Sequence, residues 1–135
     1  MSTLDGNLQI VFSHVPDGVT DEEFNAWYDM HVPEILTIPG FVSARRFRLE
    51  QVVHDGAEPI SYRYLALYEV DKDPHELLEE MAKLRLGTAD SYAERKALGD
   101  EGPELPSWWG EVRFAAWNCI SLGEVVTAPA LPASA

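Results

Sequence analysis

The fold is decided by one segment, residues 20–47, which reads TDEEFNAWYDMHVPEILTIPGFVSARRF. Thr20 and Glu23 have the spacing of a capping box, in which the threonine hydroxyl accepts from the amide three residues on. Aromatic and apolar residues then recur at helical spacing. Pro33 has no amide hydrogen and disfavours helical geometry in the residue before it, so we expect the helix to kink or end within residues 31–34.

A β-hairpin is expected to follow this helix. Its first strand is predicted over Phe41–Val53 and its second over Ser61–Val70, with a polar turn at His54–Gly56 between them. Strict alternation along the first strand places two sets of side chains on opposite faces of the sheet. These sets are Phe41, Ser43, Arg45, Phe47 and Leu49, and Val42, Ala44, Arg46, Arg48 and Glu50.

Further elements flank the hairpin. The apolar run Leu8–Ser13 predicts a strand, and Asp73 and Pro74 have the residue types of an N-cap and a first helical position. The buried stripe of that second helix is expected at Leu77, Leu78, Met81, Leu84 and Leu86. A short helix over Ser91–Leu98, a loop over Gly99–Pro106 and a strand over Trp109–Leu122 complete the pattern.

The resulting order, β-α-β-β-α-β, predicts a ferredoxin-like α+β domain. It has a four-stranded antiparallel sheet with both helices on one face, formed by residues 1–126, and a loose Ala/Pro-rich tail at residues 127–135. The other sheet face is expected to carry Tyr62, Tyr64 and Tyr68 or their strand neighbours, which are too apolar to leave wet. A second copy of the chain is the simplest cover, so we expect a homodimer.

The composition of this 135-residue chain disfavours several classes of binding partner. Ten basic residues against 23 acidic ones give a net charge of −13, which repels phosphate and disfavours nucleic acid and anionic membranes. The single cysteine, Cys119, allows no internal disulfide and disfavours a Cys-based zinc site. The first residues do not resemble a signal peptide, and no apolar run approaches the roughly 20 residues that cross a bilayer. We therefore expect a cytoplasmic protein.

The quoted segment resembles the dimeric α/β-barrel superfamily, especially its EthD-like members. The resemblance lies in an aromatic first helix that ends in His31-Val32-Pro33, and in Pro39-Gly40-Phe41 at the start of the next strand. It covers roughly residues 1–70 by motif and the rest by element order. It implies two chains packed sheet to sheet, each enclosing a pocket between its sheet and its helices. Relatives include cofactor-free polyketide cyclases, anthrone-oxidising monooxygenases, muconolactone-type isomerases, haem-handling enzymes and members with no known activity.

The resemblance also implies that His31 acts as acid or base. An unperturbed imidazole pKa of about 6.5 suits proton transfer near neutral pH. Tyr28 lies three residues earlier, so it can share a helix face with His31 and hold a carbonyl or phenolate oxygen. The alternative is that both residues pack in the core with satisfied polar groups.

Basic and aromatic residues supply candidates for binding a ligand. Arg45, Arg46 and Arg48 cluster on one strand, where Arg46 or Arg48 could anchor an acidic group inside the pocket. An ion-pair ladder across the sheet is the alternative. Aromatic side chains suit a planar ligand, and the alternative for them is the core or the dimer interface. The expected substrate-binding residues are Trp27, Arg46, Arg48, Tyr64, Trp108 and Trp109.

Motifs for metals and cofactors are not found in the sequence. His14, His54 and His75 have no metal spacing with another ligand, and no P-loop, G-x-G-x-x-G or G-x-S-x-G motif occurs. No second histidine clearly faces the expected pocket, which disfavours haem. We therefore expect neither metal nor cofactor.

These observations favour a cofactor-independent enzyme. It would act on a small aromatic, quinonoid or polyketide-like molecule by acid–base chemistry at His31, as a cyclase, isomerase, lyase or monooxygenase. The alternative is a non-catalytic dimeric ligand-binding protein, or an accessory protein for a neighbouring oxygenase pathway, which needs no titrating group.

Overall fold

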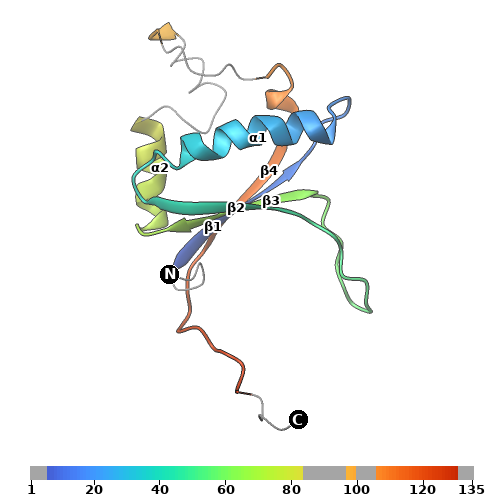
Figure 1. The fold of residues 1–135 in the computed structure, drawn as a ribbon, viewed down its shortest axis with the longest axis vertical. Coiled ribbons are helices and arrows are strands. Elements are labelled where there is room, and N and C mark those ends of the chain that lie inside the picture. Colours follow the sequence, from blue (N-terminus) through green and yellow to red (C-terminus); the bar gives the residue numbers. More distant parts are fainter. Residues whose placement is uncertain (1–5, 84–96, 100–105, 131–135) are drawn as a thin grey trace.

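A four-stranded antiparallel sheet carries two helices on one of its faces (Figure 1). The computed structural model describes residues 6–83, 97–99 and 106–130. The strands run in the order β2-β3-β1-β4, which with the chain order makes the ferredoxin-like arrangement and confirms the predicted fold class. The elements are β1 (Asn7–His14), α1 (Asp21–Ile35), β2 (Phe41–Arg48), β3 (Tyr64–Val70), α2 (Pro74–Lys83), the short 3₁₀ helix η2 (Trp109–Glu111) and β4 (Arg113–Cys119).

Helix α1 begins as the sequence predicts and ends slightly later. The Thr20 hydroxyl accepts from the Glu23 amide at 3.1 Å and donates to the Glu23 carboxylate at 3.4 Å. The helix continues through Pro33 to Ile35, one residue beyond the expected end. Asp29, whose carbonyl Pro33 leaves without a helical donor, is exposed, so water can solvate that carbonyl.

The expected facing of β2 is wrong at its first residue. Phe41 pairs with Val70 and Ser43 pairs with Glu69, so Val42 is an extra residue that bulges from the ladder. Beyond the bulge, Ala44, Arg46 and Arg48 share the helix-bearing face with Phe41, whereas the residues between them point to the other face. Simple alternation predicted that Phe41 and Arg46 lie on opposite faces of the sheet, and the bulge at Val42 places them on the same face.

The strands are shorter than the sequence suggests. β2 ends at Arg48 rather than at residue 53, β3 begins at Tyr64, and η2 replaces the first residues of the expected last strand. The N-cap at Asp73 is confirmed, since its carboxylate accepts from the His75 amide at 2.9 Å. Leu84, Leu86 and most of the expected short helix and loop over residues 91–106 lie outside the described residues.

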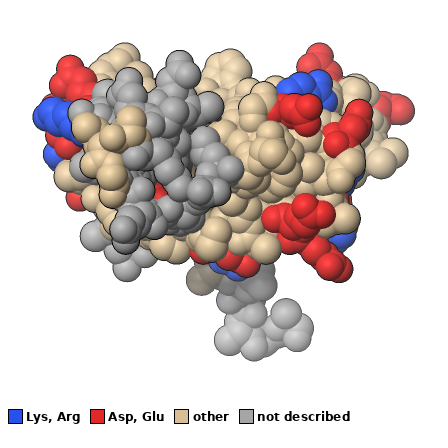
Figure 2. All heavy atoms as spheres, turned by 90° about the horizontal axis from the view of Figure 1, so that it is seen from above, with Lys and Arg blue, Asp and Glu red and all other residues tan. Residues whose placement is uncertain are grey.

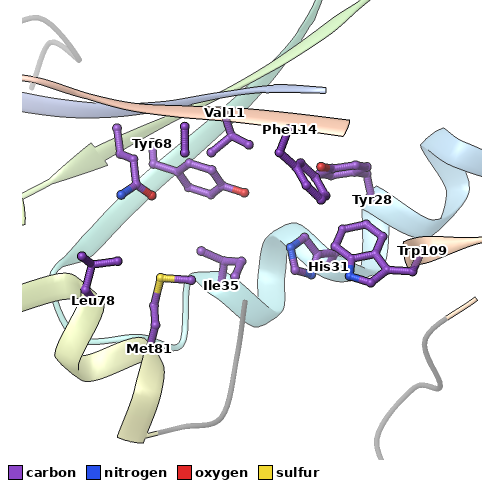
Figure 3. Close-up of a pocket in the computed structure, with 11 residues that line it drawn as sticks. Val11, Tyr28, His31, Ile35, Tyr68, Leu78, Met81, Trp109 and Phe114 are labelled. Carbon is purple, nitrogen blue, oxygen red and sulfur yellow. The ribbon is translucent and has the colours of Figure 1, made fainter. Parts of the chain in front are cut away.

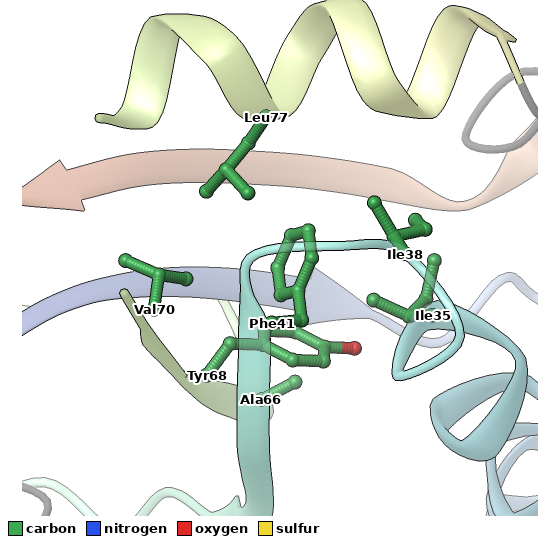
Figure 4. Packing of buried hydrophobic residues seen from close by; sticks show 7 residues of the cluster. All are labelled: Ile35, Ile38, Phe41, Ala66, Tyr68, Val70 and Leu77. Atoms are coloured by element: carbon green, nitrogen blue, oxygen red, sulfur yellow. The ribbon is translucent and has the colours of Figure 1, made fainter. Parts of the chain in front are cut away.

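A compact apolar cluster fixes α2 on the sheet (Figure 4). Leu77 of α2 and Ile38 are almost fully buried. Phe41 stands between them and the sheet, edge-on to Tyr68 with ring centroids 5.4 Å apart. Each buried side chain of this size contributes about 2 kcal/mol. The remaining members are Ile35, Ala66 and Val70.

Neither α1 nor α2 covers the opposite face of the sheet (Figure 1). The register places Leu8, Ile10 and Phe12 of β1 on this face. Of its large apolar side chains, Trp117 is 63% exposed. Of the expected residues, Tyr64 and Tyr68 are buried on the helix side, whereas their strand neighbours Leu65 and Leu67 face outward as the alternative predicted. Tyr62 packs against Phe12 of this face, with ring centroids 5.8 Å apart. Within the described part of the chain, neither helix is long and apolar enough to span a bilayer.

We expect Gly40→Ala to destabilise the fold by about 3 kcal/mol. Gly40 has φ +106°, and a Cβ there would meet Leu77 Cδ2 at 2.5 Å, so strain and overpacking add together. Gly56→Ala is the matched control, because Gly56 also has a positive φ but open space around it, and we expect it to cost about 1 kcal/mol. Urea unfolding measures both. Equal losses would mean that the contact with Leu77 carries no cost.

Candidate functional site

A cavity of about 230 Å³ lies between the sheet and the helices (Figure 3). His31 and Ile35 extend from α1 toward Val11 and Tyr68 of the sheet, and α2 closes one side (Figure 3). Most of the lining is apolar. The lining residues are Gln9, Val11, Tyr28, His31, Ile35, Tyr68, Leu78, Met81, Trp109, Phe114 and Ala116.

His31 is held by aromatic rings. It stacks on Trp27 with ring centroids 4.4 Å apart, and the rings of Tyr28 and Trp109 each lie 5.6 Å from it. Burial among these rings lowers the pKa of His31 to about 4, because an imidazolium loses its hydration there. The imidazole is therefore neutral at pH 7 and can accept a proton or a hydrogen bond.

Two tyrosine hydroxyls share the cavity with His31. Burial raises the pKa of Tyr28 to about 12, although a hydrogen bond with Ser13 and the charge of Arg46 oppose the shift. Burial also raises the pKa of Tyr68, with a further contribution from Tyr28. Both phenols therefore stay protonated near neutral pH. Each can donate a hydrogen bond to a ligand oxygen.

The electrostatics of the cavity favour an uncharged ligand. No lysine or arginine is among the described lining residues, so a carboxylate would lose its hydration without gaining a cationic partner from them. Acidic side chains also predominate over basic ones on the helix side of the molecule (Figure 2). A neutral molecule with a carbonyl or hydroxyl group meets no such penalty. In the described part of the chain, no group of His, Cys, Asp and Glu side chains could hold a metal.

The structure brings three of the predicted site residues to the cavity, namely His31, Tyr28 and Trp109. Trp27 lies behind them: it is buried, stacks on His31, and its ring centroid is 4.0 Å from that of Trp109. Trp108 lies further out and packs against Phe24. Trp27 and Trp108 therefore support the wall without lining it.

Arg46, Tyr64 and Arg48 do not line this cavity. The Arg46 guanidinium carbon lies 4.3 Å from the ring centroid of Tyr28, on the side of the ring where Phe24 and Tyr64 also pack. Tyr64 is buried and donates to Asp21 at 2.8 Å. Arg48 shares the face of Arg46, but its side chain is 68% exposed at the strand end and pairs with Glu50 at 2.7 Å. The predicted contacts of Arg46, Arg48 and Tyr64 with a ligand are therefore not supported by the lining of this cavity.

Several lining residues were not singled out by sequence reasoning. Tyr68 belongs to the aromatic residues of the hairpin, but the sequence left open which face of the sheet it occupies, and the register of β3 against β1 places it on the helix side. Gln9 and Val11 alternate along β1 and pair with Tyr68 and Ala66. This alternation could have predicted both residues, if the face of β1 that points to the helices had been known.

Comparison with known proteins shows the fold and no family. No family model matches the chain, and no curated protein matches it either. Among solved structures, the Arabidopsis thaliana protein At3g17210 is 10% identical with a TM-score of 0.55, and the match covers 89% of this chain and 99% of that one. A Shewanella loihica PV-4 protein, described as a "putative monooxygenase", is 18% identical with a TM-score of 0.38, covering 87% and 96% of the two chains. The first likeness supports the ferredoxin-like fold.

We expect acid to destabilise the protein through His31. Between the folded pKa of about 4 and the unfolded value of 6.5, the unfolded chain binds more protons, so stability falls as the pH falls through this window. From pH 7 to pH 4.5, the wild type should lose about 2 kcal/mol more than His31→Phe, which keeps a ring but cannot titrate. Urea unfolding at both pH values provides the comparison. Parallel losses in the two proteins would contradict the shifted pKa.

Proposed function

We propose that this chain is a small-molecule enzyme in which His31 removes a proton from a neutral aromatic, quinonoid or polyketide-like compound. The observation that carries the proposal is a neutral, largely buried imidazole in an apolar cavity that Tyr28 and Tyr68 also line. The base and the two donors lie in one cavity and come from two elements, α1 and β3. That is the minimum set for moving a proton and holding the anion left behind.

Burial makes the role of His31 specific. An isolated imidazolium is disfavoured there, so His31 is a poor general acid in the resting protein. It becomes a competent base when the proton comes from a ligand in the cavity, because the ligand anion then stabilises the imidazolium beside it. The hydroxyls of Tyr28 and Tyr68 donate to the developing oxyanion, and their raised pKa values keep them protonated while they do so.

Deprotonation next to a carbonyl or on a phenol is common to several reactions. Cyclisation, isomerisation, lyase-type cleavage and oxygenation of an activated phenol can all begin with this step. Proton transfer of this kind uses only side chains and needs no metal or cofactor. The small volume of the cavity favours a compact substrate with one or two rings.

We also propose that the protein works as a homodimer packed through the open sheet face. Leu8, Ile10 and Phe12 are only partly buried on that face, and Trp117 of β4 is largely exposed beside Ile10. A continuous apolar face of this kind is costly in water. A second copy, related by a two-fold axis, buries the same face on both chains.

We expect the wild type to catalyse deuterium incorporation into α-tetralone in D2O, at the carbon next to the carbonyl. α-Tetralone is a neutral, enolisable aromatic ketone, so it matches the proposed chemistry without being assumed as the natural substrate. His31→Phe should lower the rate at least 100-fold, because base catalysis contributes about 10²–10⁴-fold. The wild-type rate should rise with pH around pH 4 and level off above pH 6, since His31 must be unprotonated. Mass spectrometry measures the exchange.

Thermal shift on the same two proteins separates binding from catalysis. Stabilisation of both by α-tetralone without exchange would favour the non-catalytic ligand-binding alternative. Exchange at equal rates in both proteins would remove His31 from the mechanism.

We expect light scattering at micromolar concentration to give twice the chain mass of 15.1 kDa. Trp117→Glu should reduce the mass to that of one chain, because it places a charge on the open sheet face. Met30→Glu is the matched control, since Met30 is 51% exposed on the helix side. A wild type of 15.1 kDa, or a Trp117→Glu variant that stays dimeric, would contradict the proposed interface.

A further inference from the structure

Arg46 is a partly buried cation that forms no ion pair within the described part of the chain. Its Nη1 donates to Asn25 Oδ1 at 2.8 Å, but its Nε and Nη2 are buried and have no hydrogen-bond partner among the described residues. Within the described part of the chain, no carboxylate lies within ion-pair distance of it. Burying two donor atoms of a cation without hydrogen-bond partners is costly, so a stable fold that retains them calls for a physical explanation.

Aromatic rings surround the guanidinium. Its carbon lies 4.3 Å from the ring centroid of Tyr28, 5.1 Å from that of Tyr64 and 5.9 Å from that of Phe24. The negative faces of these rings attract the cation and offset part of the lost hydration. The shortest of the three distances is to Tyr28, whose ring also lines the cavity.

A hydrogen-bonded chain holds Arg46 in place without neutralising it. Asn25, which accepts from Arg46, donates through Nδ2 to the Tyr64 hydroxyl at 3.3 Å, and Tyr64 donates to Asp21 at 2.8 Å. Asp21 is already paired with Arg63 at 2.5 Å. Asp21, the one acid in this series of hydrogen bonds, is therefore paired with another cation, and the contacts of the Arg46 guanidinium are with Asn25 and the rings.

We propose that Arg46 is a positioning residue that acts through Tyr28, fixing its ring and stabilising negative charge at the cavity end of Tyr28 without touching the ligand. This inference rests on the proposed function for its consequence, because the charge it favours is the oxyanion formed when His31 takes a proton. The charged and titratable groups that interact with Arg46 are Tyr28 and Asp29 of α1 and Tyr64 and Tyr68 of β3. Of these, Tyr28 and Tyr68 line the cavity, and the charge of Arg46 lowers the pKa of both against the effect of burial.

The first test needs no ligand. Tyr28 is replaced by 3,5-difluorotyrosine, a close analogue with a more acidic phenol, and its ionisation is followed by fluorine NMR. Arg46→Met should raise the pKa of this phenol by about one unit, which is about tenfold in the ionisation constant. Arg46→Lys keeps the charge and should recover at least half of the shift, so loss of packing alone is distinguished from loss of charge. Arg48→Met is the control on the same face and should leave the pKa unchanged.

The second test uses 4-nitrophenol, whose phenolate absorbs visible light. Its apparent pKa when bound to the full-length protein should also rise in Arg46→Met and stay unchanged in Arg48→Met. Equal pKa values of difluorotyrosine in the wild type and Arg46→Met overturn the inference, whatever the ligand does. The difluorotyrosine pKa could shift although 4-nitrophenol shows no saturable binding. That result would support the coupling of Arg46 to Tyr28 and would count against the proposed ligand site.

Discussion

A single extra residue in β2 sets the arrangement on which the site depends. With Val42 outside the ladder, Phe41 and Arg46 both face the helices, although they lie an odd number of residues apart. Phe41 then fills the space under α2, while Arg46 reaches the rings under α1. Without the bulge, one of the two would lie on the open face. The packing of Phe41 in the core and the contact of Arg46 with the Tyr28 ring therefore both depend on the bulge at Val42.

The burial that stabilises the domain also determines its chemistry. α1 presents Trp27, Tyr28 and His31 from neighbouring turns, and the rings that exclude water from the core also exclude it from the imidazole. Desolvation then opposes both the imidazolium and the phenolate. With the imidazole neutral and both phenols protonated, His31, Tyr28 and Tyr68 carry no charge near neutral pH. The charge of Arg46, behind the Tyr28 ring, opposes the effect of burial on the pKa of that phenol.

Much of the fold could be predicted from local signals, because each is a property of adjacent residues. The capping residues Thr20 and Asp73 and the element order are of this kind. The site could be predicted only where it lies on α1, since helical spacing fixes the relative placement of Tyr28 and His31. The facing of Arg46 relative to Phe41 depends on the bulge in β2, and that of Tyr68 depends on strand register, both of which are set by tertiary packing. The lowered pKa of His31 depends on burial to which Trp109 of η2 contributes.

The cavity draws its reactive groups and one of its walls from different helices. His31 and Tyr28 belong to α1, whereas Leu78 and Met81 belong to α2, which is anchored to the sheet independently by Leu77. Methionine is a flexible, adaptable side chain, so this wall tolerates exchange. Substitutions at Leu78 and Met81 can therefore change the shape of the cavity while the rings around His31 stay the same. For the proposed activity, this architecture places the residues that shape the cavity and the residue that moves the proton on helices that can vary independently.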